Sequence, residues 1–487
     1  MKRFLALTLT LIMLLATFTA CGGGGNEPEA TTLGDASATT TSAQDNYSKE
    51  LYVGYGRANI TPRYEDGSVM PVPLAGYPFE RIATEILTDL FASCTAVRDE
   101  EGDTVLLYSV DNLHLPIEII GEIRNTIRNE MGINPKNVII TSSHAHSAPK
   151  MSDTTNIQIK KYKENILCKG VVEAAKAAIE DLTLCTELYA GRIETSGLNF
   201  IRRYVTDENG KLRHEIEGDH AMSVIKFVRD GKKDVILANW AAHCDTVITN
   251  NKYAVSGDYY YYFTELAEQE LDAHVSIFNG TSGDVNPFSK IVAENTVNGT
   301  RPYGRKLANV MIENLSSLQK LDIVGDVEAL SKTLTLEIDH SRDDKRDQAY
   351  EIINLYNAEG ESAAYKAKCK EYGITNIHEA TRIYSNSYSP ATETMNVYAV
   401  TIGNIAFGAA PYEMLTQTGA DIRSNSKFAL TFTCGYTNGS YGYIPPEYAY
   451  ELGDYEVYSC LFVKGTAEKI QAEINALMDK LHADIYG

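Results

Sequence analysis

The feature that most constrains this chain is a short apolar strand that ends at a pair of histidines. The run from Asn137 to Thr141 is apolar and β-branched, which predicts a fully buried strand. Residues 141–149 then read Thr-Ser-Ser-His-Ala-His-Ser-Ala-Pro and place His144 and His146 just beyond it. Side chains two residues apart in extended backbone point to the same side, so we expect both imidazoles to face one site.

Strand and helix patterns alternate around this segment and along the rest of the chain. Residues 116–131 carry isoleucines at the spacing of an amphipathic helix, which Gly132 ends. We therefore predict an α/β (mixed α+β) fold in which mixed β-sheets are flanked by helices. The predicted strands are 51–60, 93–97, 104–110, 137–141, 187–192, 222–228, 235–240, 275–278, 327–338, 428–434 and two within 397–409. The other predicted helices are 157–182, 259–271, 305–318, 413–423 and 467–486.

One charged segment, residues 341–385, interrupts the strand-rich pattern and is largely helical. It is either a pair of solvated surface helices or an insertion that forms a lid over a site. We favour the solvated pair, because charged helical stretches are usually solvent-facing.

The first 49 residues have the pattern of an export signal followed by a tether. Residues 1–20 combine a basic start, an apolar stretch and small residues before Cys21, and so resemble a bacterial lipoprotein signal peptide. Residues 21–49 are rich in Gly, Ala, Thr and Ser, which predicts a disordered linker. We therefore expect Cys21 to be lipidated and residues 50–487 to form one extracytoplasmic domain anchored to the bacterial cell membrane; secretion after signal cleavage is the alternative.

Charge and cysteine spacing exclude several classes of protein. The formal net charge of -21 repels nucleic acid phosphates and anionic lipid headgroups, so neither is an expected partner. The eight cysteines show no Cys-x-x-Cys spacing, which excludes a zinc ribbon. Their scatter over a large domain predicts buried free thiols and no disulfide framework.

Two further polar residues follow predicted strands, as the histidine pair does. His243 comes after strand 235–240, and Glu413 follows the strand that ends at residue 409. Loops at strand ends are where distant residues converge, and a hydrolytic zinc site needs about three or four N or O ligands with one position open. This pattern indicates a metal site at His144, His243 and Glu413, although each histidine alone has a hydrogen-bonded structural role as its alternative.

Six motifs occur in the order found in one enzyme family. They are Gly54-Tyr-Gly-Arg-Ala-Asn-Ile-Thr-Pro62, Ser143-His-Ala-His-Ser-Ala-Pro149, Asn239-Trp-Ala-Ala-His243, Ser256-Gly-Asp258, Gly283-Asp-Val-Asn-Pro287 and Pro411-Tyr-Glu413. Through these motifs residues 51–458 resemble the catalytic domain of the neutral ceramidases, a family of zinc amidases that cleave the N-acyl bond of ceramide. The His-x-His-Ser-x-Pro stretch is the most specific of the six.

The resemblance implies two groups of functional residues. Four residues would bind Zn²⁺: His144, His243, Glu413 and Tyr443. Three would hold the oxyanion that develops on the amide carbonyl: His146, Arg202 and Tyr455. Tyr441 and Arg203 are the neighbouring alternatives to Tyr443 and Arg202.

No His-Glu-x-x-His motif is present, so there is no glutamate base of the thermolysin type to nominate. Three aspartates are candidates for orienting the ligating histidines, with helix capping or turn formation as the alternative. They are Asp111, Asp258 and Asp284.

Several departures from the family pattern bear on the substrate. Asn59 stands where the family has aspartate, and Lys150-Met151 replaces Gly-Gly after the histidine motif. The chain ends at Gly487, so we expect no C-terminal β-sandwich domain. The expected activity is hydrolysis of a lipid-like or other small N-acyl amide, ceramide included. The alternatives are a metal-dependent esterase, a glycan-modifying hydrolase, or a lipoprotein that binds a ligand without turnover.

Overall fold

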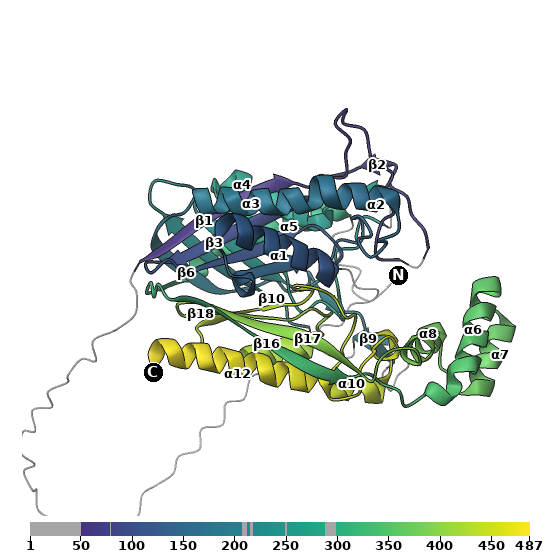
Figure 1. The fold of residues 1–487 in the computed structure, drawn as a ribbon. Helices are drawn as coiled ribbons and strands as arrows, with labels where there is room; N and C mark the ends of the chain where they lie inside the picture. The colour runs from purple at the N-terminus through teal and green to yellow at the C-terminus, as the bar shows by residue number, and fades with distance from the viewer. Residues whose placement is uncertain (1–49, 78, 207–211, 215–217, 249–250, 288–298) are drawn as a thin grey trace, which may run out of the picture. The chain divides into compact units, whose positions relative to one another are not determined.

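In the computed structural model of this chain, two β-sheets pack face to face and helices cover the outer face of each sheet (Figure 1). The chain divides into two units, residues 1–46 and 47–487. The structure describes residues 50–487 except 78, 207–211, 215–217, 249–250 and 288–298, and only the backbone of 204–206 and 212–214. The predicted signal peptide, linker and lipidation of Cys21 lie outside this range. No described helix is both long and apolar enough to cross a bilayer.

The larger sheet has the strand order β13-β11-β10-β6-β1-β3-β4-β5, with β15 also paired to β6. Only β4–β5 and β11–β13 are parallel pairs. Its strands are β1 (Leu51–Asn59), β3 (Phe91–Asp99), β4 (Thr104–Val110), β5 (Val138–Ser142), β6 (Thr183–Glu194), β10 (Ala221–Arg229), β11 (Val235–Trp240), β13 (His274–Asn279) and β15 (Gln319–Leu321).

The smaller sheet has the order β16-β17-β18-β19 and ends in the parallel pair β18–β19. Its strands are β16 (Val327–Glu337), β17 (Thr392–Ile402), β18 (Ile405–Ala409) and β19 (Leu430–Cys434). Short strands form three further pairs: β2 (Glu85–Ile86) with β12 (Ala254–Val255), β7 (Phe200–Ile201) with β14 (Val285–Asn286), and β8 (Tyr204–Thr206) with β9 (Leu212–His214).

The helices form an outer layer on each sheet. The isoleucines predicted to line one face of the first helix are all buried there. The helices over the larger sheet are α1 (Ile117–Met131), α2 (Ile157–Tyr162), α3 (Cys168–Glu180), α4 (Asp258–Leu271) and α5 (Thr300–Asn314). Those over the smaller sheet are α9 (Thr416–Ser424) and α12 (Thr466–Tyr486). Two short helices, α10 (Glu447–Leu452) and α11 (Tyr455–Tyr458), lie in the tyrosine-rich loop, and short 3₁₀ turns span Pro135–Asn137, Leu315–Ser317 and Asp343–Lys345.

The candidate residues follow the carboxyl ends of parallel strands in three strand–helix–strand units. These units are β4–α1–β5, β11–α4–β13 and β18–α9–β19. A parallel pair needs a crossover of this kind, and loops after its strands gather at one edge of the sheet. The core between the two sheets is formed by side chains such as Val53, Leu107 and Phe227 from the larger sheet and Phe407 and Phe432 from the smaller one.

The predicted helical segment forms α6 (Arg346–Glu359), α7 (Ala363–Tyr372) and α8 (Ile377–Asn386), inserted between the paired strands β16 and β17. It stands at one side of the domain in Figure 1 and has a small apolar cluster of its own around Ile352 and Ile383. The interpretation as a solvated helix pair is therefore incomplete, since the helices pack together around buried side chains.

Most predicted elements are confirmed, and the differences have local causes. The helix predicted from Glu413 begins at Thr416, because the Met414 carbonyl accepts from the Gly283 N–H at 2.8 Å and not from a later N–H of the helix. The helix predicted over 157–182 is interrupted by a π-helical turn, Lys163–Leu167. The seven cysteines among the described residues are free, and all but Cys168 are buried, as expected.

Candidate metal centre

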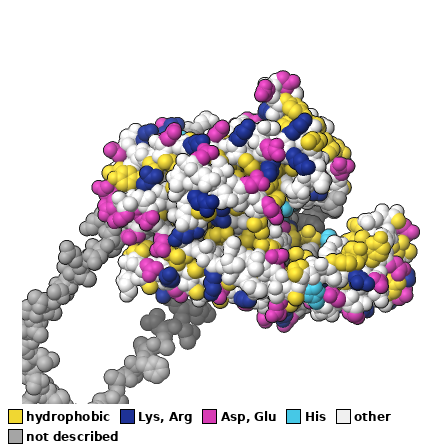
Figure 2. Space-filling model, viewed as in Figure 1, with side chains coloured by type: hydrophobic (Ala, Val, Ile, Leu, Met, Phe, Trp, Pro, Cys, Tyr) yellow, Lys and Arg dark blue, Asp and Glu magenta, His cyan; other side chains and the backbone are white. Residues whose placement is uncertain are grey.

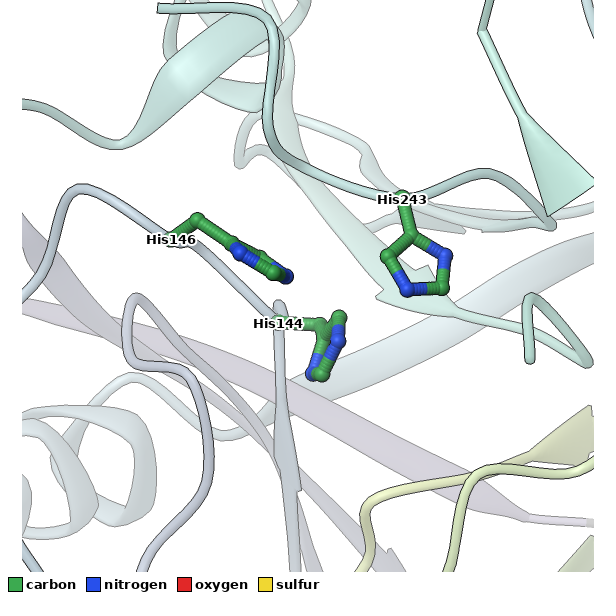
Figure 3. A group of neighbouring side chains, drawn as sticks. All are labelled: His144, His146 and His243. Atoms are coloured by element: carbon green, nitrogen blue, oxygen red, sulfur yellow. The ribbon is translucent and has the colours of Figure 1, made fainter. Parts of the chain in front are cut away.

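Three histidines meet at the carboxyl ends of β5 and β11, and Figure 3 shows their rings turned toward a common space. The ring centroid of His144 lies 4.9 Å from that of His146 and 4.8 Å from that of His243. A ligand nitrogen can be chosen from each so that all three lie within 4.8 Å of one another. The structure thus brings together residues about a hundred positions apart in the sequence.

His144 does not continue the extended backbone of β5. Its φ is 62°, in the left-handed region that residues other than glycine rarely adopt. We expected the alternation of side chains along an extended strand to orient both rings. This is wrong, because a turn at His144 orients them. The ring stacks on Tyr436 at 4.0 Å, and its Nδ1 lies 3.2 Å from the Leu113 carbonyl.

His243 is held in the same manner by carbonyl groups. Its Nδ1 lies 2.8 Å from the Ser282 carbonyl and 3.1 Å from that of Val285. A carbonyl only accepts, so Nδ1 carries the proton in both His144 and His243, and Nε2 presents its lone pair. This tautomer is the one found in metal-ligating histidines whose other nitrogen is held by the protein.

Glu413 and Tyr443 complete a set of four atoms around one point. Glu413 Oε2 lies 3.6 Å from His144 Nε2 and 3.8 Å from His243 Nε2, and the Tyr443 hydroxyl lies 3.5 Å from His243 Nε2. A tetrahedral zinc ion with ligands at about 2.0–2.2 Å needs ligand atoms about 3.3–3.6 Å apart. The three separations, 3.5 to 3.8 Å, are close to this range. Tyr441 does not reach this point, because its hydroxyl donates to the Thr394 carbonyl at 2.6 Å.

Burial sets the charge states of these groups. It lowers the pKa values of His144 and His243 well below the usual range, with neighbouring positive groups adding to the effect, so both are neutral. It raises the pKa of Glu413 to about 7, opposed by hydrogen bonds from tyrosines and by Arg202. A carboxyl group beside two neutral imidazoles suits a bound divalent ion.

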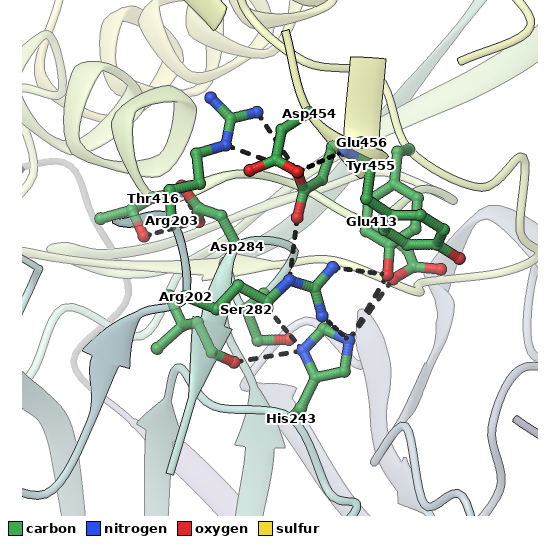
Figure 4. Close-up of polar contacts among 12 residues, drawn as sticks. Arg202, Arg203, His243, Ser282, Asp284, Glu413, Thr416, Asp454, Tyr455 and Glu456 are labelled. Atoms are coloured by element: carbon green, nitrogen blue, oxygen red, sulfur yellow. Dashed lines mark hydrogen bonds and ion pairs between the residues drawn. The ribbon is translucent and has the colours of Figure 1, made fainter. Parts of the chain in front are cut away.

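Arg202 lies beside His243, and Arg203 lies farther from that ring (Figure 4). Arg202 donates from Nε to Glu456 at 2.8 Å and from Nη2 to the Tyr443 hydroxyl at 3.0 Å, and its Nη1 lies 3.2 Å from His243 Nε2. Arg203 is buried and donates to the other oxygen of Glu456 at 3.3 Å. The geometry therefore places Arg202 at the centre and gives Arg203 the task of holding Glu456.

His146 lies beside the centre and packs against the loop that contains Gly76 and Tyr77. Gly76, with φ 93°, packs so closely on its Nδ1 that a Cβ there would lie 2.2 Å away, and the Tyr77 ring packs edge-on at 5.3 Å. Its Nε2 has no hydrogen-bond partner among the described residues. Burial, reinforced by Arg81 and Arg202, lowers its pKa to about 3. The neutral ring is therefore fixed by packing, with one nitrogen free for another group.

The three aspartates proposed to orient the histidines bond elsewhere. Asp111 accepts from the Phe91 N–H at 2.9 Å, and Asp284 accepts from the Thr416 N–H and hydroxyl at 2.9 Å. Asp258 accepts from the Val247 N–H at 3.0 Å at the start of α4. All three fasten loops, and backbone carbonyls orient the rings instead.

Sequence reasoning missed two residues of the centre. The Tyr436 ring stacks on His144. Its hydroxyl donates to Glu413 Oε2 at 3.3 Å and lies 3.0 Å from Ser282 Oγ. Its sequence signal is the same as that of His144, His243 and Glu413, namely a polar residue just after a predicted strand. Glu456 joins Arg202 to Arg203, and its only sequence signal is its place beside Tyr455.

Comparison with known proteins gives one family match and two similar solved structures, and the three agree. The family model described as "Neutral/alkaline non-lysosomal ceramidase, N-terminal" matches residues 51–299. The solved neutral ceramidase from Pseudomonas aeruginosa is similar over 90% of this chain and 75% of its own, with a TM-score of 0.68 and 16% identity. A ceramidase complexed with C2 is similar over 89% of this chain and 76% of its own, also with a TM-score of 0.68 and 16% identity. At this identity the likeness to the solved structures shows the fold, and it confirms the fold predicted from the sequence.

Proposed function

The chain belongs to the neutral/alkaline non-lysosomal ceramidase family, and from that premise we propose that it is a zinc-dependent hydrolase of N-acyl amides, with ceramide or another lipid-like amide as substrate. Membership makes it a hydrolase; the metal, the substrate and the residue roles are the proposal. The observation that carries it is the approach of polar atoms from His144, His243, Glu413 and Tyr443: Glu413 Oε2 lies 3.6 and 3.8 Å from the two Nε2 atoms, and the Tyr443 hydroxyl lies 3.5 Å from His243 Nε2.

The protein holds the metal ligands in advance of binding. Zinc at these four residues would supply a Lewis acid for the acyl carbonyl and lower the pKa of water toward neutral. Carbonyl groups of Leu113, Ser282 and Val285 fix the two imidazoles so that Nε2 faces inward. Tyr436 holds Glu413 by a hydrogen bond, so each ligand has a partner that limits its movement.

Three residues are placed to receive the negative charge that develops on the amide oxygen. Arg202 is fixed by Glu456 and brings two nitrogen atoms to the centre as a preformed positive charge. His146 presents its unpartnered Nε2, and the Tyr455 ring lies against Tyr443 at 5.3 Å. Donors held in place before the reaction need no reorganisation as charge develops, which is why we assign them this role.

The direct test is a panel of N-acyl amides of different chain lengths, each paired with the matching ester. We expect amide hydrolysis that a chelator abolishes and zinc restores, with about one zinc per chain by metal analysis. Full activity in zinc-free protein would contradict the proposal. Preferential cleavage of the esters would favour an esterase, and a ligand that raises the melting temperature without turnover would favour a binding protein.

The ligand role of Tyr443 has a matched control two residues away. Tyr443→Phe removes a hydroxyl from the centre, so we expect zinc affinity to fall by about 10- to 100-fold or more. Tyr441→Phe removes a hydroxyl that bonds only Thr394, and should leave zinc affinity unchanged. Competition with a zinc chelator of known affinity measures both; equal affinities for the two variants would remove Tyr443 from the ligand set.

A further inference from the structure

One residue of the inserted helices reaches the candidate site. The imidazole of His378, in the first turn of α8, packs edge-on against the Tyr455 ring, with centroids 4.6 Å apart and planes at 82°. On its other side Tyr455 meets Tyr443 at 5.3 Å and 73°, and the Arg202 guanidinium lies 5.6 Å from the Tyr455 ring centre. Tyr455 is thus placed between the metal-ligand candidate Tyr443 and the inserted helix.

The backbone before Tyr455 does not hold this position by itself. Gly453 has φ 63°. Asp454 has φ 154°, a backbone conformation that residues other than glycine rarely adopt. Tyr455 remains 39% exposed, so part of its surface is open to solvent. Unfavourable backbone conformations of this kind persist when surrounding contacts fix them, and they gather at functional sites.

His378 is itself firmly placed. Asn376 caps the helix by accepting from the His378 and Glu379 N–H groups, both at 3.0 Å. At the far end of α8, Asn386 donates to the carbonyls of Asp339 and Leu461 at 2.9 and 3.0 Å. These bonds fasten α8 to the end of β16 and to the segment that follows α11. Half-burial lowers the pKa of His378, so the ring is neutral and packs as an aromatic group.

We propose that His378 is a positioning residue that holds the Tyr455 ring, and hence its hydroxyl, toward the amide oxygen of the substrate. This inference rests on the proposed function, in which Tyr455 stabilises the oxyanion. Figure 2 shows the part of the molecule that carries α6–α8 standing beside a hollow in the surface. The insertion thereby contributes to catalysis through the contact of His378 with Tyr455.

The test compares variants of His378 with a matched histidine. His378→Ala should lower kcat by about 3- to 10-fold, the range for loss of an aromatic edge-to-face pair, with zinc content unchanged. His378→Phe keeps the packing and should recover kcat to within about 2-fold of wild type. His340→Ala removes a ring that bonds Asp343 and Pro390 near the start of the same insertion, and kcat should not change.

A double-mutant cycle separates positioning from a general structural effect. If His378 acts through the Tyr455 hydroxyl, His378→Ala should cause no further loss in a Tyr455→Phe background. The same fractional loss in both backgrounds, or an equal loss in His340→Ala, would overturn the proposal.

A second readout does not depend on finding the substrate. With 3-fluorotyrosine incorporated only at position 455, His378→Ala should shift and narrow the ¹⁹F resonance as the ring becomes mobile, and His378→Phe should not. An unchanged ¹⁹F resonance in His378→Ala would contradict the positioning role even if no amide in the panel is hydrolysed. A shifted resonance together with an inactive panel would contradict the proposed function alone.

Discussion

His144→Ala should abolish zinc binding and amide hydrolysis together. The imidazole supplies one of the four ligand atoms, and its Nε2 lies 3.6 Å from Glu413 Oε2, so its removal leaves an incomplete ligand set around a buried carboxyl group. Loss of one oxyanion donor alone costs about 100- to 1,000-fold in kcat, and loss of the metal should cost at least as much in kcat/KM. Metal analysis by mass spectrometry and steady-state kinetics on the best amide of the panel measure both effects.

Folding of this variant must be separated from chemistry, because His144 has a φ of 62° and its ring packs on Tyr436. Asparagine tolerates left-handed backbone, so His144→Asn should keep the fold while also losing zinc. The control is His482→Ala, whose ring packs on Phe428 and Tyr486 beyond the smaller sheet. His144→Asn with wild-type melting temperature, zinc content and activity would exclude His144 as a ligand.

The fold was largely predictable from local patterns. The isoleucine spacing of α1 and the β-branched run of β5 each reflect a period fixed by the backbone, so the elements follow from neighbouring residues. Pairing between strands that are not joined by a short turn was not predictable in this way. That β1 pairs with β3 and with the distant β6, or that β16 and β17 pair across a three-helix insertion, depends on contacts between remote segments.

The candidate site likewise has a part that was predictable from the sequence and a part that was not. His144, His243 and Glu413 were found because each follows a predicted strand, and the four-atom set shows that the loops converge. The residues that orient them were not found. Carbonyl oxygens of Leu113, Ser282 and Val285 orient the rings, and a backbone carbonyl has no signature in the sequence. The aspartates instead have the alternative role given for them, in turns and helix starts.

Helix starts at the site were misjudged for a related reason. Residues 413–423 have a helical pattern, but Glu413 forms a bridge with Tyr443, thirty residues further on, and leaves the helix to begin at Thr416. Tertiary pairing overrides local propensity here because it brings two ligand candidates side by side. His378 was hidden in the same way, within a segment that resembles a solvated surface helix.

His146→Ala should retain zinc and lose most of the activity, and this distinguishes the two possible ligand sets. One nitrogen from each of His144, His146 and His243 lies within 4.8 Å of the other two, whereas Glu413 Oε2 lies within 3.8 Å of both His144 Nε2 and His243 Nε2. Gly76 fixes His146 from behind, so the ring has little room to shift toward an ion.

With zinc retained, the loss should resemble the removal of one oxyanion donor, about 100-fold or more in kcat. Chelator competition should give the zinc affinity of wild type, and the melting temperature should change little because neither ring nitrogen has a hydrogen-bond partner among the described residues. The comparison with His144→Ala decides the matter. If both variants lose zinc to the same extent, His146 is a ligand, Glu413 or Tyr443 is displaced from the set, and the oxyanion must be held by Arg202 and Tyr455 alone.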